Sequence, residues 1–188
     1  MSNSAARGGQ PNDLRIAISG KSGCGNTTVS RIVAGRLGLR LVNFTFKDLA
    51  RDRGLSFEEV CRRAENDSEY DLTIDRMQVS LAEEGRCVLG SRLAIWLLKD
   101  SALTVYLEAG LEARAGRISR REGMPLAAAL VDTADRDRRD HDRYLRLYGY
   151  DVDSYSFASL LIDAESLDQE AVADIIVQRA RAGGPAGG

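Results

Sequence analysis

The stretch I-S-G-K-S-G-C-G-N-T-T, residues 18–28, constrains this chain more than any other. It follows an apolar run and precedes a segment whose apolar residues recur at helical spacing, so it connects a buried strand to a helix. Its glycines allow the backbone to approach an anion closely, and the start of the helix directs N–H groups toward the same point. The stretch therefore predicts a phosphate-binding loop of the kind written G-x-x-x-x-G-K-[ST].

The loop departs from that pattern at one position, because Asn26 stands where the pattern has lysine. Asparagine donates hydrogen bonds but carries no charge, and phosphoryl transfer depends on positive charge near the β- and γ-phosphates. Either another cation replaces the lysine or catalysis is lost. We predict that Mg²⁺ binds at the hydroxyl of Thr27. The predicted ATP-binding residues are Gly20, Lys21, Ser22, Gly23, Cys24, Gly25, Asn26, Thr27 and Thr28.

Five short apolar runs alternate with helical patterns along the chain. This alternation is typical of an α/β protein in which helices cover both faces of a parallel sheet. We expect a single domain over residues 14–182, with a disordered tail at 1–13 and a flexible tail at 183–188. The expected strands are 16–19, 41–42, 87–89, 103–107 and 160–162, and the expected helices include 27–37, 68–84, 126–147 and 168–181, with another starting at Ser56.

The composition argues against several classes of partner. The net charge of −2 gives no general attraction to nucleic acid or to a membrane surface. No apolar run reaches the length needed to cross a bilayer. The three cysteines are odd in number and lack metal-binding spacing, so we expect free thiols in a reducing compartment. These features predict a cytoplasmic protein without nucleic-acid or membrane partners.

Arginines are the candidate replacement for the missing lysine. Several occur in the segment Glu112–Gly123 after the fourth strand, at spacings that place them on one helix face. In the next helix, Arg136 and Arg143 are seven positions apart and share a face. Guanidinium groups near a phosphate loop suit a lid that closes on a transferring phosphoryl group, whereas Asp–Arg pairs on a solvated helix are the structural alternative. We assign catalytic roles to Arg117, Arg120, Arg121 and Arg136.

Four further motifs occur in order along the chain: D-R-G-L-S-F-E-E at 52–59, I-D-R-M-Q at 74–78, S-R-L-A at 91–94 and R-Y-L-R-L-Y-G-Y-D at 143–151. Together with the loop they resemble the nucleoside monophosphate kinases, and in particular the short cytidylate kinases of archaeal type. The resemblance covers residues 14–181. In that family the loop often lacks its lysine as well, and an arginine-rich lid is the expected source of charge.

The resemblance implies a P-loop NTPase-type, five-stranded parallel sheet with a monophosphate-binding insertion at residues 43–84 and a short arginine lid at 114–124. It also implies phosphorylation of CMP or dCMP by ATP with Mg²⁺, and we expect a monomer. Arg92 and Lys47 would bind the acceptor phosphate, and Asp75 and Gln78 would recognise the cytosine edge. The implied acceptor-binding residues are Lys47, Asp75, Gln78, Arg92 and Arg143.

The chain departs from this family at two places. Segment 43–45 is shorter than the family's S-A-G-E-[IV], which predicts a reshaped acceptor pocket. The family's L-E-G-R-L-A is L-G-S-R-L-A at 89–94, so a carboxylate that would help to hold Mg²⁺ is missing; Asp48 and Asp163 are candidate substitutes. Two alternatives stay open: a kinase for UMP, AMP or a non-nucleotide acceptor, and a nucleotide-binding regulator with weakened turnover.

Overall fold

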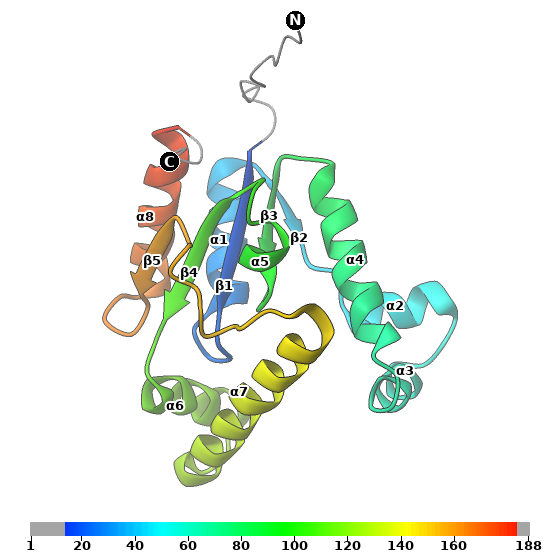
Figure 1. Ribbon diagram of the computed structural model, residues 1–188. Coiled ribbons are helices and arrows are strands. Elements are labelled where there is room, and N and C mark those ends of the chain that lie inside the picture. Colours follow the sequence, from blue (N-terminus) through cyan, green and yellow to red (C-terminus); the bar gives the residue numbers. More distant parts are fainter. Residues whose placement is uncertain (1–13, 184–188) are drawn as a thin grey trace, which may run out of the picture.

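The computed structural model describes residues 14–183, so the tails expected at 1–13 and 183–188 lie outside the described residues apart from Gly183. Its centre is a five-stranded sheet in which all four strand pairs are parallel and the order is β2-β3-β1-β4-β5 (Figure 1). The expected α/β fold with a five-stranded parallel sheet is therefore confirmed. The strands are β1 (Arg15–Gly20), β2 (Arg40–Val42), β3 (Cys87–Gly90), β4 (Leu103–Glu108) and β5 (Leu160–Asp163).

Helices follow the strands as the sequence predicted, with two additions. The eight-residue helix α2 and the single-turn helix α5 were not expected, since both are too short to show a clear hydrophobic period. The helices are α1 (Asn26–Leu37), α2 (Phe46–Arg53), α3 (Phe57–Ala64), α4 (Glu69–Glu83), α5 (Ala94–Leu97), α6 (Leu111–Glu122), α7 (Leu126–Tyr148) and α8 (Gln169–Arg181).

Alternate residues of the central strand serve two cores, one on each face of the sheet. Ile16 and Ile18 are fully buried in the core that α1 and α8 cover. Ala17, between them, belongs to the core that contains α5 and the buried Trp96. This alternation follows from the two-residue period of a strand and explains why β1 is apolar along its whole length.

Helices α2, α3 and α4 form a lobe beside the sheet (Figure 1). The lobe has a small apolar core of its own, made by Leu49, Ala50, Val60, Tyr70 and Ile74. The antiparallel helices α6 and α7 project beyond the carboxyl ends of the strands on the other side (Figure 1). Among residues 14–183, every helix is too short or too polar to span a lipid bilayer.

Candidate active site

A cleft of 630 Å³ lies at the carboxyl edge of the sheet, where ligands bind in open parallel α/β folds. The loop after β1 forms its floor, and the end of β3, the start of the α2–α4 lobe and the α6–α7 hairpin form its walls. The cleft is lined by Lys21, Ser22, Gly23, Gly25, Asn26, Thr27, Thr28, Asn43, Phe44, Thr45, Gln78, Gly90, Ser91, Arg92, Arg117, Arg121, Arg136 and Gln169.

The loop after β1 has the backbone shape of an anion-binding loop. Gly23 and Gly25 have φ angles of 88° and 102°, which residues with a side chain rarely adopt. Asn26, at the first position of α1, donates from Nδ2 to the carbonyl of Gly20 at 2.6 Å and so closes the loop on itself. The asparagine that replaces the lysine therefore holds the loop together without adding charge.

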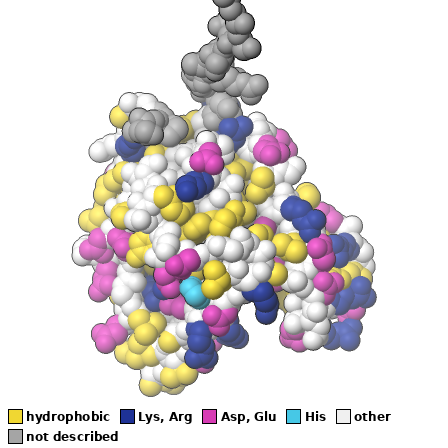
Figure 2. Space-filling model, in the orientation of Figure 1, with side chains coloured by type: hydrophobic (Ala, Val, Ile, Leu, Met, Phe, Trp, Pro, Cys, Tyr) yellow, Lys and Arg dark blue, Asp and Glu magenta, His cyan; other side chains and the backbone are white. Residues whose placement is uncertain are grey.

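Cationic side chains surround the cleft. Lys21, Arg92, Arg117, Arg121 and Arg136 all line it, and among residues 14–183 no aspartate or glutamate does. Figure 2 shows basic side chains over the lower half of the molecule, on the side of α7 and the α2–α4 lobe. An anionic ligand is the natural partner for such a lining.

Carboxylates just outside the cleft pair with two of these cations. Arg92 pairs with Asp140, and Arg136 pairs with Asp132 at 2.9 Å, both from α7. Each guanidinium can therefore exchange a carboxylate for a phosphate, which presents oxygens in a similar geometry.

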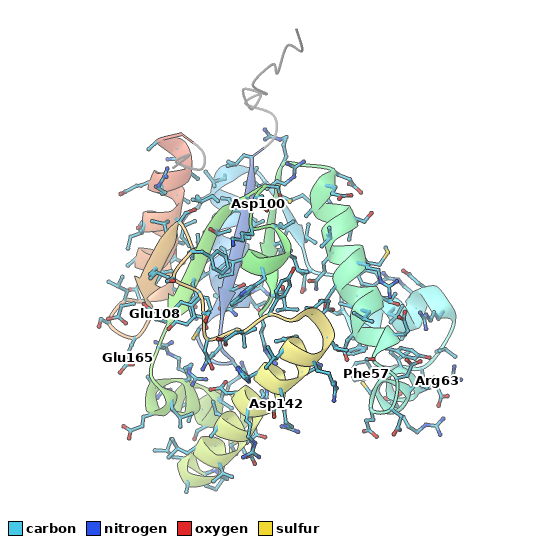
Figure 3. All side chains as sticks on the ribbon, in the orientation of Figure 1. Phe57, Arg63, Asp100, Glu108, Asp142 and Glu165 are labelled. Atoms are coloured by element: carbon cyan, nitrogen blue, oxygen red, sulfur yellow. The ribbon has the colours of Figure 1, made fainter. Side chains whose placement is uncertain are left out.

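Four predicted site residues beyond the phosphate-binding loop lie outside the cleft lining. Arg120 is exposed. Lys47 is exposed too, with its ammonium 5.7 Å from the ring of Phe57, the first residue of α3 (Figure 3). Asp75 accepts a hydrogen bond from the hydroxyl of Tyr148, and Arg143 pairs with Asp71 at 3.0 Å. In this structure the last two residues connect α4 to α7.

Two residues of the loop also lie behind the cleft rather than in it. Gly20 ends β1, and a side chain there would meet the carbonyl of Leu107 at 2.7 Å, so the position requires glycine. Cys24 is buried, and burial raises the pKa of its thiol to about 11. The thiol is therefore neutral at pH 7 and fills space beneath the loop.

Three buried polar atoms of cleft-lining residues have no hydrogen-bond partner: Oδ1 of Asn26, Oε1 of Gln78 and Oγ of Ser91. An unpartnered buried polar atom costs about 1–3 kcal/mol, so proteins seldom keep one without a function. Sequence reasoning assigned no role to Ser91, although its place just after a buried strand was a usable signal.

Comparison with known proteins decides the family. A model described as the cytidylate kinase-like family matches residues 15–166. The chain belongs to this family. Cytidylate kinase 2 of Borreliella afzelii is 41% identical over 167 residues, covering 87% of this chain and 94% of that protein. Cytidylate kinase of Pyrococcus horikoshii is 37% identical over 165 residues, covering 87% of this chain and 86% of that protein.

Solved structures share the fold at lower identity. Shikimate kinase from Acinetobacter baumannii, solved with shikimate, superposes with a TM-score of 0.61 at 19% identity, covering 90% of this chain and 93% of that one. An uncharacterised protein from Eubacterium ventriosum gives a TM-score of 0.66 at 18% identity, covering 90% and 99%. The expected resemblance to short cytidylate kinases and the expected kinase fold are thus both confirmed.

The structure gives a packing reason for one departure of this cytidylate kinase-like chain from its family. Gly90 stands where the resemblance to the family implies a glutamate at the end of the third strand, and α1 packs directly against it. A Cβ atom at position 90 would lie 2.8 Å from Cβ and 2.2 Å from Oγ of Ser30. Ser30 is fully buried, so it has little room to move away.

We predict that Gly90→Ala lowers the free energy of unfolding by about 1–3 kcal/mol, because the added methyl group overpacks this contact. Chemical denaturation measures the change. Gly35→Ala, within α1 and with no atom within 4 Å of the added carbon, is the control and should stabilise the protein by about 0.5–1 kcal/mol. Equal stability of Gly90→Ala and the unmodified protein would show that Ser30 can move aside without a cost in free energy.

The two carboxylates considered as substitutes for the missing glutamate are occupied elsewhere. Asp48 accepts hydrogen bonds from the backbone N–H and the hydroxyl of Thr45, at 2.9 and 2.8 Å, which lowers its pKa. Asp163 accepts hydrogen bonds from the hydroxyl and the N–H of Ser166, which lowers its pKa as well.

The exposed Thr27 hydroxyl does line the cleft, and Mg²⁺ usually takes few protein ligands beside water and phosphate oxygens. The lining therefore fits an Mg²⁺ ion that one hydroxyl and a nucleotide hold together.

A second, smaller cleft of 220 Å³ adjoins the loop on the side of α8. It shares Arg117 and Gln169 with the main cleft, and its other lining residues are mostly apolar. An apolar recess next to a phosphate-binding loop suits a flat nucleobase. The lining residues of this recess are Cys24, Val29, Arg117, Ala164, Leu167, Asp168, Gln169 and Val172.

Proposed function

We propose that this protein transfers the γ-phosphoryl group of ATP to CMP or dCMP. One observation carries the proposal: a single cleft joins a phosphate-binding loop to a buried amide, with arginines between them and without a lining carboxylate among residues 14–183. Curated relatives that cover most of the chain are named cytidylate kinase.

The donor nucleotide is assigned to the loop and the recess beside it. Backbone N–H groups of the loop and the N-terminus of α1 bind the phosphates of ATP. The adenine occupies the 220 Å³ recess, which Arg117 joins to the main cleft. Mg²⁺, held by Thr27 and the nucleotide, supplies charge neutralisation to the phosphates when bound.

The acceptor is assigned to the opposite wall of the cleft. Arg92, two positions after the end of β3, binds the phosphate of the monophosphate, and the base extends toward α4. We retain Arg121 and Arg136 as the groups that meet the transferring phosphoryl group, because both line the cleft between the two nucleotide sites. The acceptor is already an anion, so positioning and charge neutralisation suffice without a general base.

Gln78 supports cytosine as the acceptor base. Its Nε2 donates to the carbonyl of Phe44 at 2.9 Å, which fixes the orientation of the amide. Its Oε1 is buried and lacks a partner, so the base must present a hydrogen-bond donor there. Cytosine has an exocyclic amino group at this edge, whereas uracil has a carbonyl oxygen that Oε1 would repel.

Gln78→Leu is expected to lower kcat/KM for CMP by about ten- to a hundredfold, because the base loses a buried hydrogen bond. Activity with UMP should stay the same or rise, so the ratio of the two kcat/KM values is the decisive measurement. Arg76→Gln, an exposed position on the same helix paired with Glu69, is the control and should leave this ratio unchanged. An unchanged CMP-to-UMP ratio in Gln78→Leu would remove Gln78 from base recognition.

A direct assay tests the proposed function. The protein is incubated with ATP, Mg²⁺ and, in separate reactions, CMP, dCMP, UMP, AMP or shikimate, and ADP release is followed. We expect ADP release with CMP and dCMP well above that with the other acceptors. Release with AMP, UMP or shikimate but not with CMP would instead support a kinase for a different acceptor. ATP binding in a thermal-shift measurement without ADP release from any acceptor would favour the nucleotide-binding regulator.

A further inference from the structure

We propose that Arg114 and Asp137 hold the phosphate-binding loop from behind and that Arg114 is a positioning residue for ATP. The proposal rests on the proposed function to the extent that ATP is taken as the ligand of the loop. Arg114 lies on α6 and Asp137 on α7, and neither lines the 630 Å³ cleft.

The two side chains form a buried ion pair with two hydrogen bonds. Nη1 and Nη2 of Arg114 donate to the two carboxylate oxygens of Asp137 at 3.1 and 2.7 Å. The side chains are 5% and 16% exposed, respectively. Moving two charged groups out of water costs free energy, so a buried ion pair need not stabilise the fold. The presence of this pair therefore calls for another explanation.

The remaining donors of Arg114 point to the backbone. Nη1 donates to the carbonyl of Ser22 at 3.1 Å, and Nε donates to the carbonyl of Ala109, just after β4, at 3.0 Å. Arg117, one turn further along α6, donates to the next loop carbonyl, that of Gly23, at 3.3 Å. Consecutive carbonyls of the loop are therefore held by α6.

This arrangement determines which way the N–H groups of the loop point. In a trans peptide the C=O and N–H groups point in opposite directions, and residues 14–183 contain no cis peptide bond. When Arg114 binds the carbonyl of Ser22, the N–H of Gly23 in the same peptide is directed away from α6. Gly23 lines the cleft, so its N–H is available to a phosphate there.

Tight packing reinforces the hydrogen bond. A Cβ atom added to Gly23 would lie 2.9 Å from both Cβ and the carbonyl oxygen of Arg114. The loop backbone thus rests directly on α6 at the residue that supplies the guanidinium. A preorganised binding site loses affinity when such support is removed, because binding must then order the loop.

Asp137 connects this support to the cationic wall of the cleft. Asp137 follows Arg136, which lines the cleft. It lies one helical turn before Asp140, which pairs with Arg92. The ion pair is therefore one of several contacts that place α7 next to the loop.

The test compares the single variant Arg114→Met with the double variant Arg114→Met/Asp137→Leu. The single variant leaves a buried carboxylate unpaired, so it should lose both thermal stability and ATP affinity. The double variant replaces the ion pair with apolar groups of similar volume, so its unfolding temperature should recover toward that of the unmodified protein. Its Kd for ATP–Mg²⁺ should stay raised by about tenfold, because the bond to the Ser22 carbonyl is still missing. The KM for CMP should change by less than about twofold, because neither residue contacts the acceptor wall.

Recovery of both stability and ATP affinity in the double variant would overturn the proposal, because the pair would then be structural only. Arg114→Lys covers the case in which that variant does not fold: it keeps the charge, but a single ammonium cannot reproduce the four hydrogen bonds of the guanidinium, so its ATP affinity should also fall. Unchanged ATP affinity in Arg114→Lys would overturn the proposal as well.

Arg138→Met, which removes an exposed arginine of α7 paired with Asp135, is the matched control and should behave like the unmodified protein. Unmodified protein that binds ATP without phosphorylating CMP would refute the proposed function alone, since the ATP affinities would still test the ion pair.

Discussion

Arg121→Ala is expected to lower kcat for CMP phosphorylation by about a thousandfold, while KM for ATP changes little. The guanidinium of Arg121 lines the cleft near the loop that lacks a lysine, and its partner in this structure is the exposed Glu122 at 2.6 Å. Because this ion pair is exposed to solvent, it costs little to break, and Arg121 can then meet the charge that develops on the transferring phosphoryl group. Single-turnover kinetics at saturating ATP and CMP measure the effect on the chemical step.

Variants of two other arginines of the α6–α7 hairpin serve as controls for this measurement. Arg138→Ala removes an exposed arginine of α7 and should retain normal kcat. Arg120→Ala should lower kcat less than Arg121→Ala does, because Arg120 is not part of the cleft lining. Equal losses in Arg120→Ala and Arg121→Ala would show that the hairpin rotates on ligand binding. A normal rate in Arg121→Ala would remove Arg121 from the catalytic machinery.

Arg92→Ala is expected to cost at least about 2 kcal/mol of transition-state stabilisation, or about thirtyfold in kcat/KM for CMP. Arg92 follows β3 at the carboxyl edge of the sheet and lines the cleft beside the unpartnered hydroxyl of Ser91. Its loss would leave the acceptor phosphate without a charged donor, whereas Asp140 would keep its ion pair with Arg143 at 3.5 Å. The loss should appear with CMP as the varied substrate, whereas the Kd for ATP should be nearly unchanged.

Arg40→Ala is the control for this prediction. Arg40 begins β2 at the amino edge of the sheet and pairs with Glu84 at 3.2 Å, so it is a strand-end arginine far from the cleft lining. It should keep normal kcat/KM for CMP. Near-normal kcat/KM for CMP in Arg92→Ala would show that Arg92 is not the acceptor-phosphate ligand.

Local patterns in the sequence were sufficient to predict the sheet and the loop. Buried parallel strands are apolar along their length, and the glycines of the loop mark a backbone that a side chain would block, as they do at Gly20 and Gly23. Both signals involve residues close together in the chain. The spacing of the arginines on α6 was equally visible, but not which of them faces the cleft. That depends on how the helix packs against the loop, which places Arg121 in the lining and leaves Arg120 outside it.

Contacts between distant segments account for what the sequence could not predict. Arg143 and Asp71 are 72 positions apart and pair between α7 and α4, a contact that the sequence did not predict. Gly90 faces Ser30 across the junction of β3 and α1, and neither residue alone signals the other. Arg114 received no role from the sequence, although it contacts the phosphate loop directly. Each of these contacts requires the tertiary structure.

The central claim is that arginines around the cleft supply the charge that Asn26 does not. The measurement that tests it most directly is the single-turnover rate of Asn26→Lys, made in the unmodified protein and in the Arg121→Ala background. We predict that Asn26→Lys gives no large acceleration in the unmodified protein, because arginines already occupy the cleft and the bond from Asn26 to the Gly20 carbonyl is lost. Arg121→Ala should remain slow by about a hundredfold or more with either residue at position 26. A large acceleration by lysine in the unmodified protein, with Arg121 dispensable, would contradict the claim and show that the loop is simply defective.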